Sequence, residues 1–175
     1  RQVMRWVGFG DASWATIKGV FSMYGVVIKS EMPHLEEGVF QGAMIARAIR
    51  EKSIPSASAT IAELHGTVET IDRLLPIRGM SEEIAGVADE TTRTDRAFGT
   101  AGPSSVRTHP TAIRCDNASL VIVMNNVTSN KGKGLRRVAR LIQCVKALME
   151  RQIVSVQGIP GTKQEANPMS KILPA

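Results

Sequence analysis

The sequence predicts an α/β domain in which helices pack on a mixed sheet. Segments rich in β-branched and aromatic residues are interspersed with segments whose apolar residues recur at helical spacing. The 175 residues are 43% hydrophobic and 22% charged, so a single domain with an aliphatic core is expected over residues 1–175. No apolar run approaches the roughly 20 residues needed to span a bilayer, which argues against a membrane protein.

The termini and cysteines favour an intracellular protein. The first ten residues lack a hydrophobic block followed by a small-residue cleavage site, so no secretory signal is predicted. Cys115 and Cys144 form no C-x-x-C motif and are expected to be reduced thiols. We therefore expect the protein in the cytoplasm, the nucleus or an organelle. The sequence begins at Arg1 rather than Met, which suggests a segment of a longer chain.

The first part of the chain predicts strands. Residues 3–14 are expected to form a strand that places Asp11 on the same face as apolar neighbours, because side chains alternate along a strand. Residues 19–28 are β-branched and aromatic and predict a second strand, joined to the first by a short connection of hairpin type. Residues 43–50 fit a helix or a strand equally well. The acidic residues 31–42, which lie between the segments 19–28 and 43–50, are expected to form a loop.

A helix follows, and a long irregular segment comes after it. Ser56 and Ser58 offer N-cap side chains, and apolar residues then recur at helical spacing until Pro76 and Gly79, where we expect the helix to end. Glu63 lies in its first turn or two. Residues 80–111 are rich in Gly, Thr, Ser, Pro and charges, and are expected to be an insertion or a mobile loop.

The last third predicts alternating strands and helices. Residues 112–116 resemble a short buried strand, residues 117–127 a short helix, and residues 138–149 a strongly amphipathic helix. Residues 153–159 predict a further strand, and residues 167–173 a short terminal helix. The order of these elements is the basis for the mixed sheet.

The net charge of +6 is confined to the last third of the chain. Residues 1–115 hold 13 basic and 13 acidic residues, whereas residues 116–175 hold nine basic and three acidic ones. Such asymmetry is typical of a polyanion-binding face, and equally of a basic surface without a partner. The densest group, here called the basic cluster, consists of Lys131, Lys133, Arg136, Arg137 and Arg140.

Three acidic residues stand at or near the ends of predicted elements: Asp11, Glu63 and Asp116. A carboxylate aligned with apolar residues is costly to bury unless a cation neutralises it. The three could converge on hard metal ions, or they could be ordinary surface acids. The sequence lacks the Gly and Ser/Thr pattern of a phosphate-binding P-loop, as well as the motifs G-x-S-x-G and H-E-x-x-H.

Four short motifs in order carry a family resemblance. They are GFGDASW at residues 8–14, SATIAEL at 58–64, CDN at 115–117, and a tail at 159–173 that aligns without gaps on the pattern VPSEDQLADIFTKPL. On these motifs the chain resembles the ribonuclease H domain that ends the polyprotein of copia-type LTR retrotransposons. The resemblance implies a ribonuclease H-like fold, with a mixed five-stranded sheet and helices on both faces.

The resemblance also implies site residues. The family's four acidic positions fall on Asp11, Glu63, Asp116 and Asn167, so the fourth acid is replaced by an amide. These four would be the catalytic and metal-binding residues, holding Mg²⁺ with Mn²⁺ as a substitute. Two further departures are the longer spacing between Glu63 and Asp116 and the loss of a histidine before the helix at 138–149.

The function implied is metal-dependent hydrolysis of the RNA strand of RNA–DNA hybrids. The basic cluster would then lie along phosphates of the hybrid or of RNA. The expected partner is the reverse transcriptase domain of the same polyprotein or a larger nucleoprotein complex. An alternative is a domesticated, catalytically weak or inactive module retained for nucleic-acid binding or as a structural subunit. An integrase-like transferase is less favoured, because its acids usually run Asp, Asp, Glu.

Overall fold

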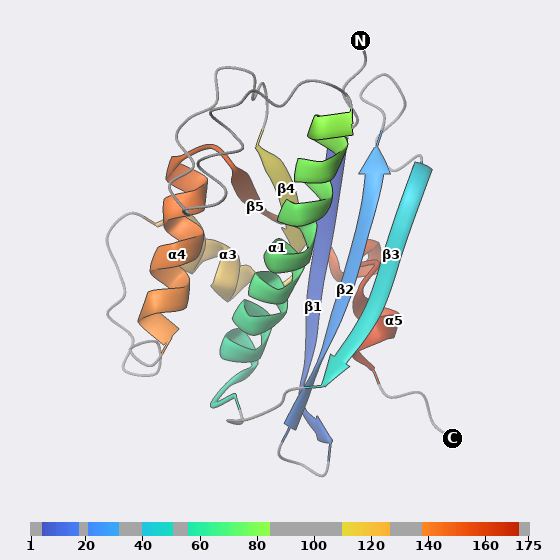
Figure 1. Ribbon diagram of the computed structural model, residues 1–175. Coiled ribbons are helices and arrows are strands. Elements are labelled where there is room, and N and C mark those ends of the chain that lie inside the picture. The colour runs from blue at the N-terminus through green and yellow to red at the C-terminus, as the bar shows by residue number, and fades with distance from the viewer. Residues whose placement is uncertain are drawn as a thin grey trace.

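Five strands form one mixed sheet in the computed structural model (Figure 1). The structure describes residues 5–17, 21–31, 40–50, 56–84, 110–126 and 138–171. The strand order is β3-β2-β1-β4-β5, and the antiparallel pairs β1–β2 and β2–β3 adjoin the parallel pairs β1–β4 and β4–β5. The bounds are β1 Arg5–Ile17, β2 Phe21–Glu31, β3 Phe40–Arg50, β4 Thr111–Cys115 and β5 Val154–Gly158.

Helices pack on both faces of this sheet, as the sequence predicted. One face is covered by α1 (Ala59–Ile84), α3 (Ala118–Asn125) and α4 (Ala139–Glu150), whose buried side chains share one apolar cluster with the sheet. The short helix α5 (Asn167–Ser170) lies on the opposite face, beyond the 3₁₀ turn η2 (Gly161–Lys163). Figure 1 shows α1 in front of the sheet and α5 behind it.

Helix α1 is longer than predicted, because it continues through Pro76 and Gly79 to Ile84. A proline inside a helix lacks the backbone donor and crowds the preceding turn, so contacts beyond it must hold the last turns in place. Arg78 supplies them by donating from Nη1 to Thr111 Oγ1 at 2.6 Å and to the Ile153 carbonyl at 2.9 Å. Residues 80–84 are therefore helical, whereas residues 85–109 of the predicted insertion lie outside the described residues.

The other predictions differ from the structure mainly at element ends. Residues 43–50, which fitted either state, belong to strand β3, whose partner β2 satisfies its backbone. Strands β1 and β2 both extend beyond their predicted ends. The side chain of Asn117 caps α3 by accepting from the Leu120 N–H at 3.0 Å. Within the described chain, no helix combines the length and the apolar character that crossing a membrane requires.

Helix α5 approaches strand β2 so closely that only glycine fits between them. A Cβ built on Gly25 would lie 2.2 Å from the Ala166 carbonyl oxygen and 2.9 Å from the Ser170 nitrogen. Both are backbone atoms, which cannot rotate away as a side chain can. The position of α5 over the sheet therefore requires a residue without a Cβ atom, a glycine, at position 25.

We predict that Gly25→Ala displaces α5 and destabilises the protein by about 1–3 kcal/mol, the usual cost of forcing an extra methyl group into a packed interior. Urea unfolding measures the loss, and limited proteolysis of the tail reports the displacement. Gly158→Ala is the matched control, since its Cβ would meet only the Val121 side chain at 3.6 Å. Equal stability of the two variants would contradict the proposed packing.

Candidate metal site

Three elements bring Asp11, Glu63 and Asp116 together. Asp11 lies in β1, Glu63 in the second turn of α1, and Asp116 directly after β4. Asp11 and Glu63 are only 5% and 6% exposed, whereas Asp116 is half-buried. The charge of Asp116 raises the pKa of both Asp11 and Glu63, and the charge of Asp11 also raises that of Glu63. The three side chains form one electrostatic group, here called the acidic site.

Close packing of α1 on β1 places Glu63 beside Asp11. A Cβ on Gly66, one turn after Glu63, would lie 3.0 Å from the Asp11 carbonyl oxygen. A Cβ on Gly10 would lie 2.9 Å from Thr70 Oγ1 and 3.1 Å from the Gly66 carbonyl oxygen. Small residues on both elements thus let the helix backbone approach the strand backbone. The carboxylate of Glu63 consequently reaches the acidic site from the helix side.

Burial makes ionisation of Glu63 unfavourable. Desolvation, followed by the charges of Asp11 and Asp116, raises its pKa to about 8, against a smaller opposing effect of a hydrogen bond with the Ala12 backbone. Its Oε2 atom is buried without a hydrogen-bond partner among the described residues. A buried acceptor left unpaired costs roughly 1–3 kcal/mol. A cation at this oxygen would remove both penalties.

Asp11 is held from the other side of the sheet. The fully buried Ser170 of α5 donates from its hydroxyl to Asp11 Oδ2. Burial is the largest influence on the pKa of Asp11 and raises it; the Ser170 hydrogen bond lowers it, Asp116 raises it, and the positive charge of Lys171 lowers it. Asp11 therefore has a fixed orientation and a partly balanced charge.

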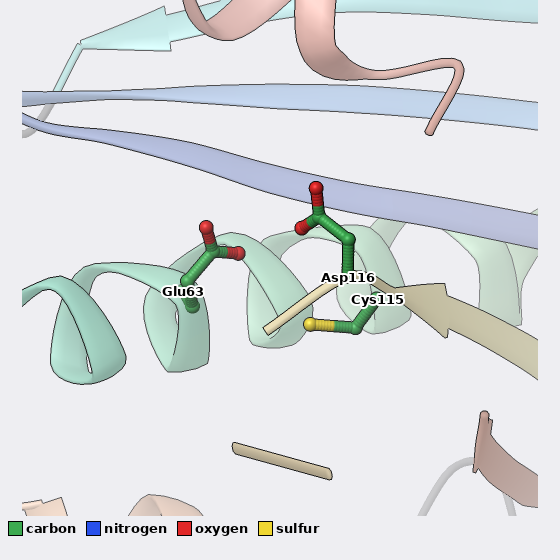
Figure 2. Close-up of side chains that lie close together, drawn as sticks. All are labelled: Glu63, Cys115 and Asp116. Carbon is green, nitrogen blue, oxygen red and sulfur yellow. The ribbon is translucent and has the colours of Figure 1, made fainter. Parts of the chain in front are cut away.

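Cys115 also lies at the acidic site, although it was not predicted as a site residue. Its Sγ and the carboxylate oxygens of Glu63 and Asp116 all lie within 4.8 Å of one another, and Figure 2 shows the three side chains beside α1. Burial raises the pKa of the thiol to about 12, outweighing a hydrogen bond from the Asn117 backbone; the three acids raise it further. The only signal in the sequence was its place next to Asp116.

The oxygen donors of the acidic site fit a hard divalent cation. Mg²⁺ prefers carboxylate, carbonyl and water oxygens, and it is bound by a few carboxylates together with substrate phosphates. The three carboxylates form one electrostatic group, and Glu63 Oε2 has no hydrogen-bond partner among the described residues, so the group offers both charge and ligands. A protonated thiol is a poor ligand for Mg²⁺, so the carboxylate oxygens suit this ion better than the sulfur of Cys115 does.

Asn167 is close to this group in the chain but is not joined to it by a described contact. It is the first residue of α5 and half-buried, and the residue three positions later, Ser170, makes the contact with Asp11. The structure thus brings α5 to the acidic site through Ser170. A catalytic or metal-binding role for Asn167 stays a prediction.

The basic cluster falls almost entirely outside the described residues. Lys131, Lys133, Arg136 and Arg137 belong to the undescribed part of the chain, and Arg140 is exposed in the first turn of α4. Its role as a nucleic-acid surface therefore also stays a prediction. Lys171, which was not singled out from the sequence, is an exposed cation whose charge acts on Asp11.

Side-chain contacts hold the described part of the tail, residues 159–171, against the sheet. The buried Gln164 donates from Nε2 to the Gly10 carbonyl oxygen at 2.9 Å. Glu165 pairs with the buried Lys29 of β2 at 2.5 Å. At the start of the tail, a Cβ on Gly161 would lie 3.3 Å from Asp116 Oδ2. The tail thus contacts the strand that carries Asp11 and also approaches Asp116.

Comparison with solved structures identifies the fold. The N-terminal RNase H domain of a Mycobacterium tuberculosis protein, solved as a fusion with maltose-binding protein, superposes with a TM-score of 0.53 at 15% identity, covering 95% of this chain and 91% of that one. LC11-RNase H1 in complex with an RNA/DNA hybrid gives 0.52 at 15% identity, covering 94% and 93%. A second structure of LC11-RNase H1, isolated from compost by a metagenomic approach, gives 0.51 at 16% identity, covering 94% and 91%.

Sequence comparison adds no family assignment: no family model matches the chain, and no curated protein matches it. At 15–16% identity the structural likeness extends to the fold and no further. The mixed five-stranded sheet with helices on both faces is the fold of RNase H domains.

Proposed function

We propose that this protein is a metal-dependent endoribonuclease that hydrolyses the RNA strand of RNA–DNA hybrids. The observation that carries the proposal is the electrostatic coupling of Glu63 with Asp11 and Asp116, together with a buried Glu63 oxygen that has no partner among the described residues. Buried carboxylates that repel one another are unfavourable for folding, and a site that binds cations explains why they are present. The RNase H fold of the chain agrees with this chemistry.

The acidic site would hold Mg²⁺ or Mn²⁺ through Asp11, Glu63 and Asp116. When bound, a divalent ion would lower the pKa of the attacking water and stabilise the negative charge on the leaving oxygen. Ser170 keeps the Asp11 carboxylate in one orientation. Asn167 would add a neutral amide oxygen where the resembled family has a carboxylate, which reduces the negative charge near α5.

The fold and the charge of the chain support an RNA–DNA hybrid as the proposed substrate. One structural neighbour, LC11-RNase H1, was solved in complex with an RNA/DNA hybrid. A hybrid displays 2′-hydroxyls on one strand only, so a protein can distinguish RNA from DNA by shape and backbone. The basic cluster and Lys171 would contact phosphates, and binding would therefore weaken steeply with salt.

The retroelement context rests on the four sequence motifs. They resemble the ribonuclease H domain of copia-type polyproteins, so we propose a reverse transcriptase domain, or a nucleoprotein complex derived from one, as the partner. Asn167 favours a second candidate, a module that binds hybrids but cuts them slowly or not at all.

A cleavage assay tests the nuclease directly. With a labelled RNA–DNA hybrid and Mg²⁺ or Mn²⁺, we expect cuts confined to the RNA strand. Asp116→Asn should slow them at least about 100-fold, since even groups outside the first ligand shell contribute 10–100-fold. Asp72→Asn, an exposed acid of α1, is the matched control and should cleave normally. Tight, salt-sensitive binding without cutting in either metal would favour the binding module.

Asn167→Asp tests the altered fourth position. If Asn167 borders the metal site, a carboxylate there adds charge, and we expect both a faster cleavage rate and a lower Mg²⁺ concentration for half-maximal rate. The rate measured across a Mg²⁺ titration separates the two effects. An unchanged rate and Mg²⁺ dependence would place Asn167 outside the site.

The raised pKa of Glu63 predicts the pH dependence of stability. The pKa is 4.5 for the ordinary side chain and about 8 in the fold, so the folded state binds more protons between these values. The contribution of neutral Glu63 is complete below pH 4.5 and is lost as the pH rises to about 8. One pKa unit corresponds to about 1.4 kcal/mol, so the loss amounts to a few kcal/mol.

We therefore expect Glu63→Gln to be more stable than the wild type at pH 8.5 in EDTA. At pH 5 this advantage should be much smaller. Urea unfolding at both pH values measures the difference. Added Mg²⁺ should stabilise the wild type at pH 8.5 more than the variant, because ligand binding to the folded state raises stability. Glu150→Gln, an exposed acid of α4, controls for the change in net charge. Parallel pH profiles for wild type and Glu63→Gln would refute the assigned pKa.

A further inference from the structure

The acidic site contains one donor that Mg²⁺ chemistry does not use. Cys115 Sγ lies within 4.8 Å of a carboxylate oxygen of Glu63 and of Asp116, and those two oxygens are equally close to each other. The side chain of Cys115 is fully buried. Figure 2 shows its sulfur and the carboxylates of Glu63 and Asp116 gathered beside α1. One sulfur and two oxygens are therefore close enough together to bind one cation.

An unpaired buried oxygen of the same Glu63 carboxylate independently indicates a ligand at these three side chains. Glu63 is only 6% exposed, and its Oε2 has no hydrogen-bond partner among the described residues. The half-buried Asp116 leaves a side of the group open to solvent. A cation could therefore enter past Asp116 and satisfy the Glu63 oxygen.

The type of donor determines which cation fits. Thiolate sulfur is soft and favours Zn²⁺ over Mg²⁺, whereas carboxylates accept either ion. Zn²⁺ is bound by Cys, His, Asp and Glu, and a site with three protein ligands keeps a fourth position for water or substrate. Cys115, Glu63 and Asp116 make up such a set of three.

We propose that Cys115, Glu63 and Asp116 form a Zn²⁺ site that overlaps the Mg²⁺ site and inhibits the protein when occupied. On binding, the S–H bond of Cys115 breaks, a Zn–S bond forms, and the proton leaves to solvent. No oxidant or reductant is needed. Zn²⁺ and Mg²⁺ exclude each other, because both use the carboxylates of Glu63 and Asp116.

The inhibition rests on the proposed function, whereas the Zn²⁺ site itself does not. Cd²⁺ is a suitable probe, because a Cd–thiolate bond gives an ultraviolet charge-transfer band and Zn²⁺ in excess abolishes it. The exposed Cys144 also offers a thiol, so the full chain is studied in a Cys144→Ser background. In that protein we expect one Cd²⁺ per chain with the thiolate band.

Two further variants in the same background separate a three-residue site from a lone thiol. Cys115→Ser should abolish the band, and its hydroxyl can still accept the hydrogen bond from the Asn117 N–H. Glu63→Gln retains the thiol, and we expect its Cd²⁺ affinity to fall at least about ten-fold. Circular dichroism of each variant confirms that it is folded.

Absence of a thiolate band in Cys144→Ser, or an unchanged Cd²⁺ affinity in Glu63→Gln, would overturn the Zn²⁺ site. If the band depends on both Cys115 and Glu63 and Zn²⁺ also stops cleavage of the hybrid, the whole proposal is supported. If the band shows this dependence but no hybrid is cleaved in Mg²⁺ or Mn²⁺, the Zn²⁺ site stands and the nuclease function fails.

Discussion

The close approach of α1 to β1 is the constraint on which the acidic site depends. Gly10 and Gly66 allow the two backbones to pack closely. Glu63 lies one turn before Gly66, so this packing places it near Asp11. The same contact removes Glu63 from water and raises its pKa. The packing that stabilises the fold thus creates an electrostatic penalty at its centre. A divalent cation would relieve that penalty, which links the stability of the protein to the occupancy of the site.

The tail fixes the acidic site from the opposite face. Gly25 leaves room for α5, and α5 in turn directs Ser170 at Asp11. Gln164 and Glu165 hold the preceding residues to β1 and β2. Asp11 is therefore oriented by an element about 160 positions further along the chain, so its geometry depends on the whole sheet being assembled.

The sequence was informative where local chemistry decides the structure. The alternation in β1, the cap at Ser58 and the apolar periodicity of α4 were each visible in the residues. Its failures occurred where distant contacts decide. Pro76 does not end α1, because Arg78 binds Thr111 and the Ile153 carbonyl, and no local pattern reveals such contacts. Residues 43–50 became a strand because β2 offered a partner.

The residues of the acidic site divide in the same way into those with a local signal in the sequence and those that depend on distant contacts. Its three carboxylates were predicted from short motifs and a family resemblance, since acids at element ends are a local signal. Cys115 and Ser170 were not assigned a role, because their importance comes from what they face. In an ideal strand, Cys115 and Asp116 would point to opposite faces. Asp116 lies just beyond the end of β4, so it escapes that alternation and both side chains reach the site.

Charge within the acidic site is unevenly distributed, and this bears on both proposed cations. Towards α5, Asp11 receives a hydrogen bond from Ser170 and is influenced by the positive charge of Lys171. Towards α1, Glu63 Oε2 has no hydrogen-bond partner among the described residues, and burial together with the charges of Asp11 and Asp116 raises the pKa of the Glu63 carboxyl. Glu63 and Asp116, the two carboxylates beside Cys115, are therefore the ones that the two proposed cations would share. Mg²⁺ and Zn²⁺ would compete at this point because either ion could bind the Glu63 oxygen that has no partner among the described residues.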